Sequence, residues 1–241
     1  MAMRNVLLSF FLAATVSAQR DPGPQPREVS PGPWGGAPSD AVVLDHAKWR
    51  TKDGTPNRCM ASAGVMSCSS GAGDIISTET FRSAQIHVEF RPPVMPDQKG
   101  QMKGNSGVYI HGRYELQVLD SFQNPTYATG MLGALYGQAA PLVNAAKPPG
   151  EWQSYDIVFR APGCDAAGRV VKPATVTALV NGVLVQDHVE IDPARSDQEH
   201  KRLGDKGLCD AGPLKLQDHS GFPNAPHTTI EFRNIWFRRL D

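Results

Sequence analysis

The sequence has no excess of charge of either sign. Lys and Arg together number 24, Asp and Glu also number 24, and the formal net charge at pH 7 is zero. Nucleic acids and anionic membrane surfaces attract proteins through basic patches that pair with phosphate groups. We therefore expect no nucleic-acid partner and no membrane partner.

Long apolar runs are also scarce. The one sustained run covers residues 6–16, which is too short to span a bilayer. Arg4 precedes it, and the small residues Ser17 and Ala18 follow it, as in a secretion signal cleaved before Gln19. The residue directly after the cleavage point is Gln19 and not cysteine, so a lipid anchor is not expected. We predict a signal peptide at residues 1–18 and a secreted or periplasmic mature protein.

Cysteine is rare, with only four in the chain. An even number of cysteines in an exported protein favours disulfides. We predict the pairs Cys59–Cys68 and Cys164–Cys209, because the first two are close in sequence and flank an expected hairpin. A zinc site is the weaker alternative, since none of the spacings is typical of a zinc-ligand knuckle.

Helical periodicity is lacking, whereas turn residues are abundant: glycine and proline number 23 and 20. Residues 19–38, rich in both, predict a flexible lead-in, and residues 39–241 a single domain. Residues 84–91 alternate as a strand with His87 and Arg91 on a solvated face. Residues 152–160 predict a strand whose Tyr155, Ile157 and Phe159 point inward.

Asn181-Gly182 lies between two alternating apolar segments, residues 175–180 and 183–189, and this is a strong hairpin signal. About a dozen short strands with frequent turn signals can be counted along the chain. The expected fold is therefore all-β, a two-sheet β-sandwich of jelly-roll type.

Residues 104–122, GNSGVYIHGRYELQVLDSF, are the most informative segment. Polar side chains occupy the odd positions and mostly apolar ones the even positions, which predicts one long strand with a polar face toward a cleft. On this interpretation the polar side chains lie in a row about 6.6 Å apart. They are Asn105, Tyr109, His111, Arg113, Glu115 and Gln117. A solvated strand with a local Arg113–Glu115 pair is the alternative.

After Gln117 the alternation shifts by one residue. A bulge at Val118 and Leu119 would return Asp120 to the polar face, beside Glu115. The long connection after Ser121 carries enough apolar residues to be ordered, and we expect it to fold over the cleft.

Several separated motifs occur in a specific order: the 104–122 segment, LYGQAAPLVNAAKPPGEWQSYDIVFRAP, VNGVLVQD, LQDH and FRNIWFRRL. In that order they resemble the 3-keto-disaccharide hydrolase domain, long catalogued as a domain of unknown function. The resemblance covers about residues 40–240. It implies a fold of the concanavalin-like lectin and laminarinase-type glucanase kind.

One departure from the related glucanases bears on mechanism. Their cleft strand carries Glu-x-Asp-x-x-Glu, whereas this chain has Glu115, Gln117 and Asp120 at the same spacing. Retaining hydrolysis uses two carboxyl groups about 5–5.5 Å apart. The amide at Gln117 and the shorter Asp120 therefore disfavour an ordinary endo-glucanase.

The resemblance implies instead a substrate already oxidised to a ketone at carbon 3. The ketone acidifies the hydrogen on carbon 2, so a base can form an enolate and the group on carbon 1 can leave before water adds. Such a route needs a base, an acid and a positive charge near the enolate oxygen. It also implies a functional link to a sugar 3-oxidoreductase. A lectin-like module that binds glycans without catalysis is the alternative.

We expect the following roles within this scheme. Glu115 and His111 are candidate bases or acids, with Asp120 and His219 as further catalytic residues. Substrate contacts are expected from Asn105, Tyr109, Arg113, Gln117, Tyr136, Lys147 and Trp152, and the positive charges of Arg113 and Lys147 could stabilise the enolate. Glu115, Asp120 and His219 could together hold a divalent metal ion. The alternatives are that His219 caps a loop, that Lys147 is a solvated charge, and that Tyr136 and Trp152 belong to the core.

Overall fold

The computed structural model describes residues 25–195, 207–221 and 224–241. The predicted signal peptide lies outside these residues. Within them, no helix is long and apolar enough to cross a membrane.

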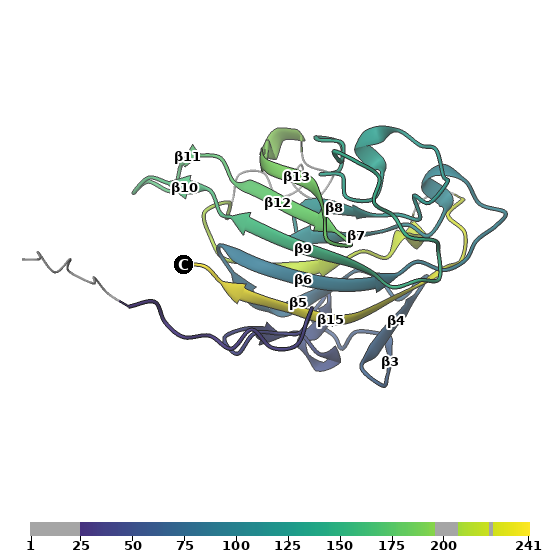
Figure 1. Cartoon of the computed structure of the whole chain (residues 1–241), viewed down its shortest axis with the longest axis horizontal. Coiled ribbons are helices and arrows are strands. Elements are labelled where there is room, and N and C mark those ends of the chain that lie inside the picture. The colour runs from purple at the N-terminus through teal and green to yellow at the C-terminus, as the bar shows by residue number, and fades with distance from the viewer. Residues whose placement is uncertain (1–24, 196–206, 222–223) are drawn as a thin grey trace, which may run out of the picture.

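Two antiparallel sheets form the molecule, with a small two-stranded sheet at one end (Figure 1). The larger sheet has the order β13-β12-β9-β6-β15-β4-β3, with β1 also pairing with β15, and the smaller has the order β2-β5-β14-β7-β8. The all-β sandwich prediction is confirmed.

The strands are β1 (Val42–Val43), β2 (Trp49–Thr51), β3 (Met60–Ser62), β4 (Val65–Ser69), β5 (Ile75–Phe81), β6 (Ala84–Arg91), β7 (Ser106–Ile110), β8 (Tyr114–Val118), β9 (Gln153–Arg160), β10 (Gly163–Cys164), β11 (Val170–Lys172), β12 (Thr175–Val180), β13 (Val183–Glu190), β14 (Gly212–Leu216) and β15 (Thr229–Arg239). Short 3-10 turns are η1 (His46–Lys48), η2 (Gly100–Met102), η3 (Ala128–Gly130), η4 (Pro193–Arg195) and η5 (His219–Gly221).

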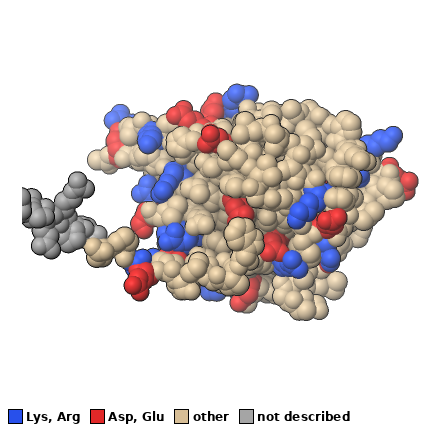
Figure 2. Space-filling view, in the orientation of Figure 1, with Lys and Arg blue, Asp and Glu red and all other residues tan. Residues whose placement is uncertain are grey.

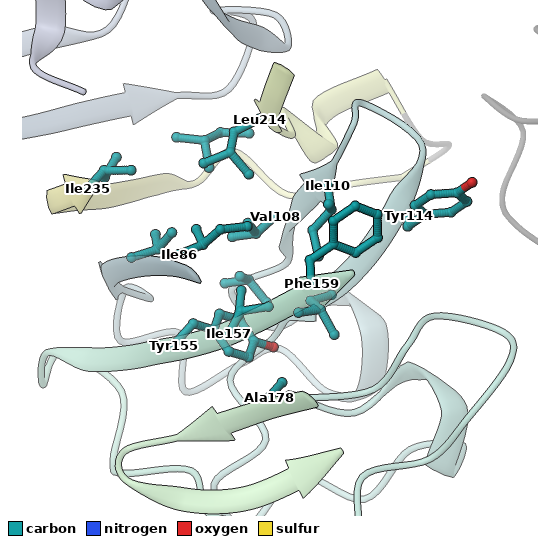
Figure 3. Packing of buried hydrophobic residues seen from close by; sticks show 14 of the residues in the cluster. Ile86, Val108, Ile110, Tyr114, Tyr155, Ile157, Phe159, Ala178, Leu214 and Ile235 are labelled. Carbon is teal, nitrogen blue, oxygen red and sulfur yellow. The ribbon is translucent and has the colours of Figure 1, made fainter. Parts of the chain in front are cut away.

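The core lies between the two sheets and is built largely from alternate residues of their longer strands (Figure 3). Tyr155, Ile157 and Phe159 of β9 are buried, as their alternation predicted. The predicted β12–β13 hairpin also forms, and Asn181 and Gly182 both have positive φ angles of 52° and 81°. Two positive φ angles at these positions are typical of the turn that matches strand twist.

The predicted long strand over residues 104–122 is wrong, because this segment is the β7–β8 hairpin. His111 and Gly112 have φ angles of 55° and 63°, and Arg113 N donates to Ile110 O at 3.0 Å. The three-residue connection is odd in number, so the polar and apolar parity continues through the turn. Period-two alternation alone therefore cannot reveal the reversal.

The predicted bulge is also not formed. β8 pairs with β7 without a register shift from Tyr114 to Val118, and the strand ends there. Asp120 follows in a loop, where its backbone N donates to Lys103 O at 3.1 Å.

Both predicted disulfides are present. Cys59–Cys68 closes the β3–β4 hairpin, with nine residues of sequence separation. Cys164–Cys209 joins β10 to the segment before β14 across a separation of 45 residues. No free cysteine occurs in the described residues.

Residues 29–38, named here the N-terminal strap, contact the outward face of the larger sheet. Gly35 O accepts hydrogen bonds from Asn234 Nδ2 at 2.7 Å and from Trp236 Nε1 at 3.3 Å. A Cβ added to Gly35 would lie 3.9 Å from His87 Cε1. His87 is buried beneath the strap, so its predicted place on a solvated face is wrong.

Candidate functional site

The outward face of the smaller sheet carries a row of buried polar side chains. Tyr109 on β7 pairs with Glu115 on β8 and with Lys215 on β14, so the three point to the same side. Their exposed fractions are 1%, 6% and 7%. The hairpin thus places Tyr109 directly beside Glu115, whereas a single strand would have set them far apart.

Gly107 leaves room for the Glu115 carboxylate. A Cβ added to Gly107 would overlap Glu115 Oε1 and would lie 2.7 Å from Tyr109 Cε2. Real Cβ atoms do not approach other atoms so closely. Glycine at this position therefore forms a slot that holds the carboxylate against the sheet.

A cation and an amide hold Tyr109 in place. Lys215 Nζ lies 3.6 Å from the centroid of the Tyr109 ring, a cation–π contact, and 3.3 Å from Asp74 Oδ2. Gln217 Nε2 donates to the Tyr109 hydroxyl at 3.0 Å. The row therefore combines a carboxylate, a phenol and an ammonium group.

Amide side chains fill the neighbouring part of this face. Gln117 Nε2 donates to Gln101 Oε1 at 3.0 Å and to Gly130 O at 3.2 Å. Asn105 Nδ2 donates to Gln101 O at 2.8 Å. The structure thus brings the predicted Asn105 and Gln117 together through Gln101. Gln101 could not be identified from the sequence, because it lies in the short η2 turn, where no periodic pattern marks its direction.

The connection after β8 runs along the free edge of that strand. Gln117 N donates to Ala134 O and Tyr136 N donates to Glu115 O, both at 3.0 Å. Tyr155 reaches across from β9, and its hydroxyl donates to Gln117 O at 2.5 Å while it accepts from Gly133 N at 2.8 Å. Burial raises the pKa of Tyr155, which stays a neutral donor. The backbone of Glu115 is therefore fixed from both sides.

Tyr136 lies at this edge, and its hydroxyl is 2.6 Å from that of Tyr127.

Asp120 is fully buried and pairs with Lys103 Nζ at 3.0 Å. Its Oδ1 accepts from Phe122 N at 3.1 Å. Asp120 is thus engaged with the loop before β7.

His219 lies in η5 and, with Asn105, Gln217 and Asp218, lines a small pocket. The Asp218 carboxylate accepts from Gly71 N and Gly73 N, both at 2.8 Å. Burial lowers the pKa of His219, although Asp218 opposes the shift. The neutral imidazole is therefore favoured there.

The predicted metal ligands Glu115, Asp120 and His219 are not brought together. Across the ranges that the structure describes, no three His, Cys, Asp or Glu side chains are placed to hold a metal ion. Their spacing in the sequence left the geometry undetermined: Glu115 lies in β8, Asp120 in the loop after it, and His219 in η5.

His111 lies in the hairpin turn, with its ring against the core. Its centroid is 4.8 Å from that of Phe159 and 5.2 Å from that of Phe81, and its Nε2 donates to Arg82 O at 3.0 Å. Burial lowers the pKa of His111 to about 4. The structure therefore places this residue among core aromatic rings and not in the row with Glu115.

Replacing His111 by asparagine, which also tolerates a positive φ, should reduce the pH dependence of stability. The unfolded chain protonates this histidine near pH 6.5, whereas the folded chain does so only near pH 4. Neutral His111 therefore makes its full contribution to the free energy of unfolding above pH 6.5, and this contribution falls by about 3 kcal/mol as the pH is lowered to 4. Urea unfolding of both proteins at pH 7 and pH 4 measures the difference, and equal losses would contradict it.

Arg113 is buried beside the hairpin turn, and a Cβ added to Gly207 would lie 3.5 Å from its Nη2. Lys147 and Trp152 lie elsewhere, along a groove on the outward face of the larger sheet. There Lys147 Nζ donates to Trp152 O at 3.2 Å. These two predicted substrate contacts therefore do not share a face with Glu115.

The fold is similar to three solved structures from Parabacteroides distasonis, each described as a "putative glycosyl hydrolase". The first has 34% sequence identity and a TM-score of 0.78, and the match covers 95% of this chain and 97% of that one. The second has 20% identity and a TM-score of 0.60, with 84% and 94% covered. The third has 18% identity and a TM-score of 0.53, with 83% and 99% covered. At the two lower identities the likeness shows the fold alone.

No curated protein matches the sequence. The family resemblance found in the sequence motifs is confirmed, because residues 40–238 match the model of a carbohydrate-acting domain family. The chain belongs to the family of 3-keto-alpha-glucoside-1,2-lyase-like domains.

Proposed function

We propose that the protein is an exported carbohydrate-active enzyme that cleaves 3-keto-glycosides, with Glu115 as the base. The observation that carries this proposal is the position of the Glu115 carboxylate, buried over Gly107 and beside Tyr109. A largely buried carboxylate beside a phenol, with an ammonium group against the same phenol, supplies the base and the positive charge that proton abstraction beside a ketone requires.

The chemistry follows from these groups. Glu115 takes the proton from carbon 2, and the electron pair of that bond forms the enolate with the ketone oxygen on carbon 3. Lys215 is the cation of the row, and it stabilises the enolate oxygen. The bond from carbon 1 to the leaving oxygen then breaks, and protonated Glu115 returns its proton to that oxygen. Addition of water across the resulting double bond gives the free 3-keto sugar.

Lys215 takes the role that the sequence analysis had given to Arg113 and Lys147. It lies against Tyr109, which pairs with Glu115 in the same row, and Asp74 keeps its ammonium group oriented. Arg113 lies at the hairpin turn, and Lys147 lies in a loop that lines the groove on the larger sheet. Gln101, Asn105 and Gln117 supply amide groups on the neighbouring part of this face for binding sugar hydroxyls.

Export is part of the proposal. Two disulfides form in the described residues, and disulfides persist in oxidising compartments such as the periplasm and the extracellular space. The substrate would then be a glycoside met outside the cytoplasm, after a separate oxidoreductase has oxidised carbon 3.

A chromogenic 3-keto-glucoside, assayed beside the matching unoxidised glucoside, tests the function. Elimination needs the acidity that the ketone confers, so aglycone should be released from the keto substrate only. Release from the unoxidised glucoside at the same rate would overturn the mechanism. Binding of both compounds without release of aglycone would instead favour a glycan-binding module.

A further inference from the structure

A second candidate binding site lies on the outward face of the larger sheet, opposite the face that carries Glu115. The groove has a volume of about 1040 Å³ and lies between the N-terminal strap and strands β6, β9, β12 and β15. Figure 1 looks onto this sheet, with the strap crossing beside β15. Such a volume suits an extended ligand of several rings.

Tryptophan is concentrated in this groove. Trp34, Trp152 and Trp236 line it, and the whole chain has only four tryptophans. Trp34 on the strap is fully exposed, which is unusual for so large an apolar ring. Flat aromatic rings pack against the apolar faces of sugar rings, and amide groups beside them bind hydroxyls. The amide side chains in the groove are Gln85, Gln153 and Asn181.

Both arginines that line the groove are paired with carboxylates. Arg233 Nε lies 2.6 Å from Glu89 Oε2, and Arg238 Nη2 lies 2.8 Å from Asp40 Oδ2 at the groove edge. Acidic and basic side chains accordingly lie interspersed on this face (Figure 2). A charged ligand that bound to these groups would have to break one of the pairs. A neutral polyhydroxyl ligand can bond to their remaining donors and lone pairs without doing so.

His87 on the groove floor is held by Asp156, with Nδ1 2.7 Å from Asp156 Oδ1, and its ring stacks on Trp236. Among the described residues its Nε2 has no hydrogen-bond partner, and Glu89 Oε1 is 3.6 Å away. Trp152 is fixed in a similar way, because Arg233 lies 4.0 Å and Arg91 4.8 Å from its ring centroid. The rings of His87, Trp152 and Trp236 are thus pre-positioned, which lowers the entropic cost of binding.

We propose that this groove binds a neutral oligosaccharide, separately from the face that carries Glu115. The proposal accounts for Lys147 and Trp152, which the sequence analysis expected at a sugar site and which the fold places here. It does not depend on the keto chemistry, because it uses other residues on the opposite sheet. Its function would be to hold the protein on a glycan chain.

Calorimetric titration of the full chain with cellohexaose, maltohexaose and laminarihexaose tests the proposal. At least one should bind, and Trp34→Ala and Trp152→Ala should each weaken its Kd about tenfold. Because the Trp34 side chain is fully exposed, its removal cannot disturb packing. Val171→Ala, which removes an exposed apolar side chain from β11, serves as the matched control and should bind as wild type.

Glu115→Gln separates the two faces and should leave this affinity unchanged. Binding that is weakened by Glu115→Gln but not by Trp34→Ala would place the ligand on the other sheet and overturn the proposal. Failure of all three oligosaccharides to bind the wild-type chain would also overturn it. Neither result would decide the activity on 3-keto-glycosides, which is measured separately by aglycone release.

Discussion

Replacing Glu115 by glutamine should lower kcat on a chromogenic 3-keto-glucoside by about 10²- to 10⁴-fold, the range that a general base contributes. Glutamine has nearly the same shape, so it fits the slot over Gly107 and keeps the packing against Tyr109. It cannot take a proton from carbon 2. The expected loss is therefore in kcat, with KM changed little.

A stopped or continuous assay of aglycone release measures this effect, and thermal unfolding verifies that the variant folds. Glu151→Gln is the matched control, because Glu151 is an exposed carboxylate in the loop before β9. It should retain full activity. Near-normal turnover by Glu115→Gln would remove Glu115 from the mechanism and, with it, the proposed role of the β7–β8 row.

Replacing Gly107 by alanine should lower kcat by about 10²-fold, because a displaced catalytic group loses its alignment. The new Cβ would overlap Glu115 Oε1, and the carboxylate must rotate away or the strands must separate. Gly107 is not among the glycines with positive φ, so alanine causes no backbone strain there. The effect should therefore come from the side-chain contact alone.

The double variant Gly107→Ala, Glu115→Gln distinguishes this explanation from a general disturbance of the sheet. If Gly107 acts by holding the carboxylate, adding Gly107→Ala to the Glu115→Gln protein should cost little further activity. If the loss of activity in the double variant instead equals the product of the two single losses, Gly107 acts through something other than Glu115. Unfolding by urea should accompany the kinetics, so that lost stability is not counted as lost catalysis.

Local patterns predicted the parts of the fold that depend on neighbouring residues. Tyr155, Ile157 and Phe159 face the core because side chains alternate along any strand. Asn181-Gly182 forms a hairpin because both residues readily adopt positive φ. The alternation within β7 and β8 was likewise predicted correctly, and it placed Tyr109 and Glu115 on one face.

The same pattern could not reveal the turn at His111 and Gly112. An odd-numbered connection preserves alternation, so one strand and two strands look alike in sequence. The difference matters for chemistry, since pairing in the sheet sets Tyr109 beside Glu115 and turns His111 against Phe81 and Phe159. The place of Lys215 in the row could not be predicted either, because β14 follows about a hundred residues later in the chain and only sheet pairing sets it beside β7.

The sequence by itself determined the all-β class, the disulfide pairs, the family and the polar character of the face that carries Glu115. These depend on residue type, spacing and parity, which are local or motif-level properties. Tertiary structure alone decided which polar groups meet: Lys215 with Tyr109, Lys103 with Asp120, and Trp152 with Arg233 on the opposite sheet. Strand order and loop packing set those contacts, because they bring together residues that no periodicity connects.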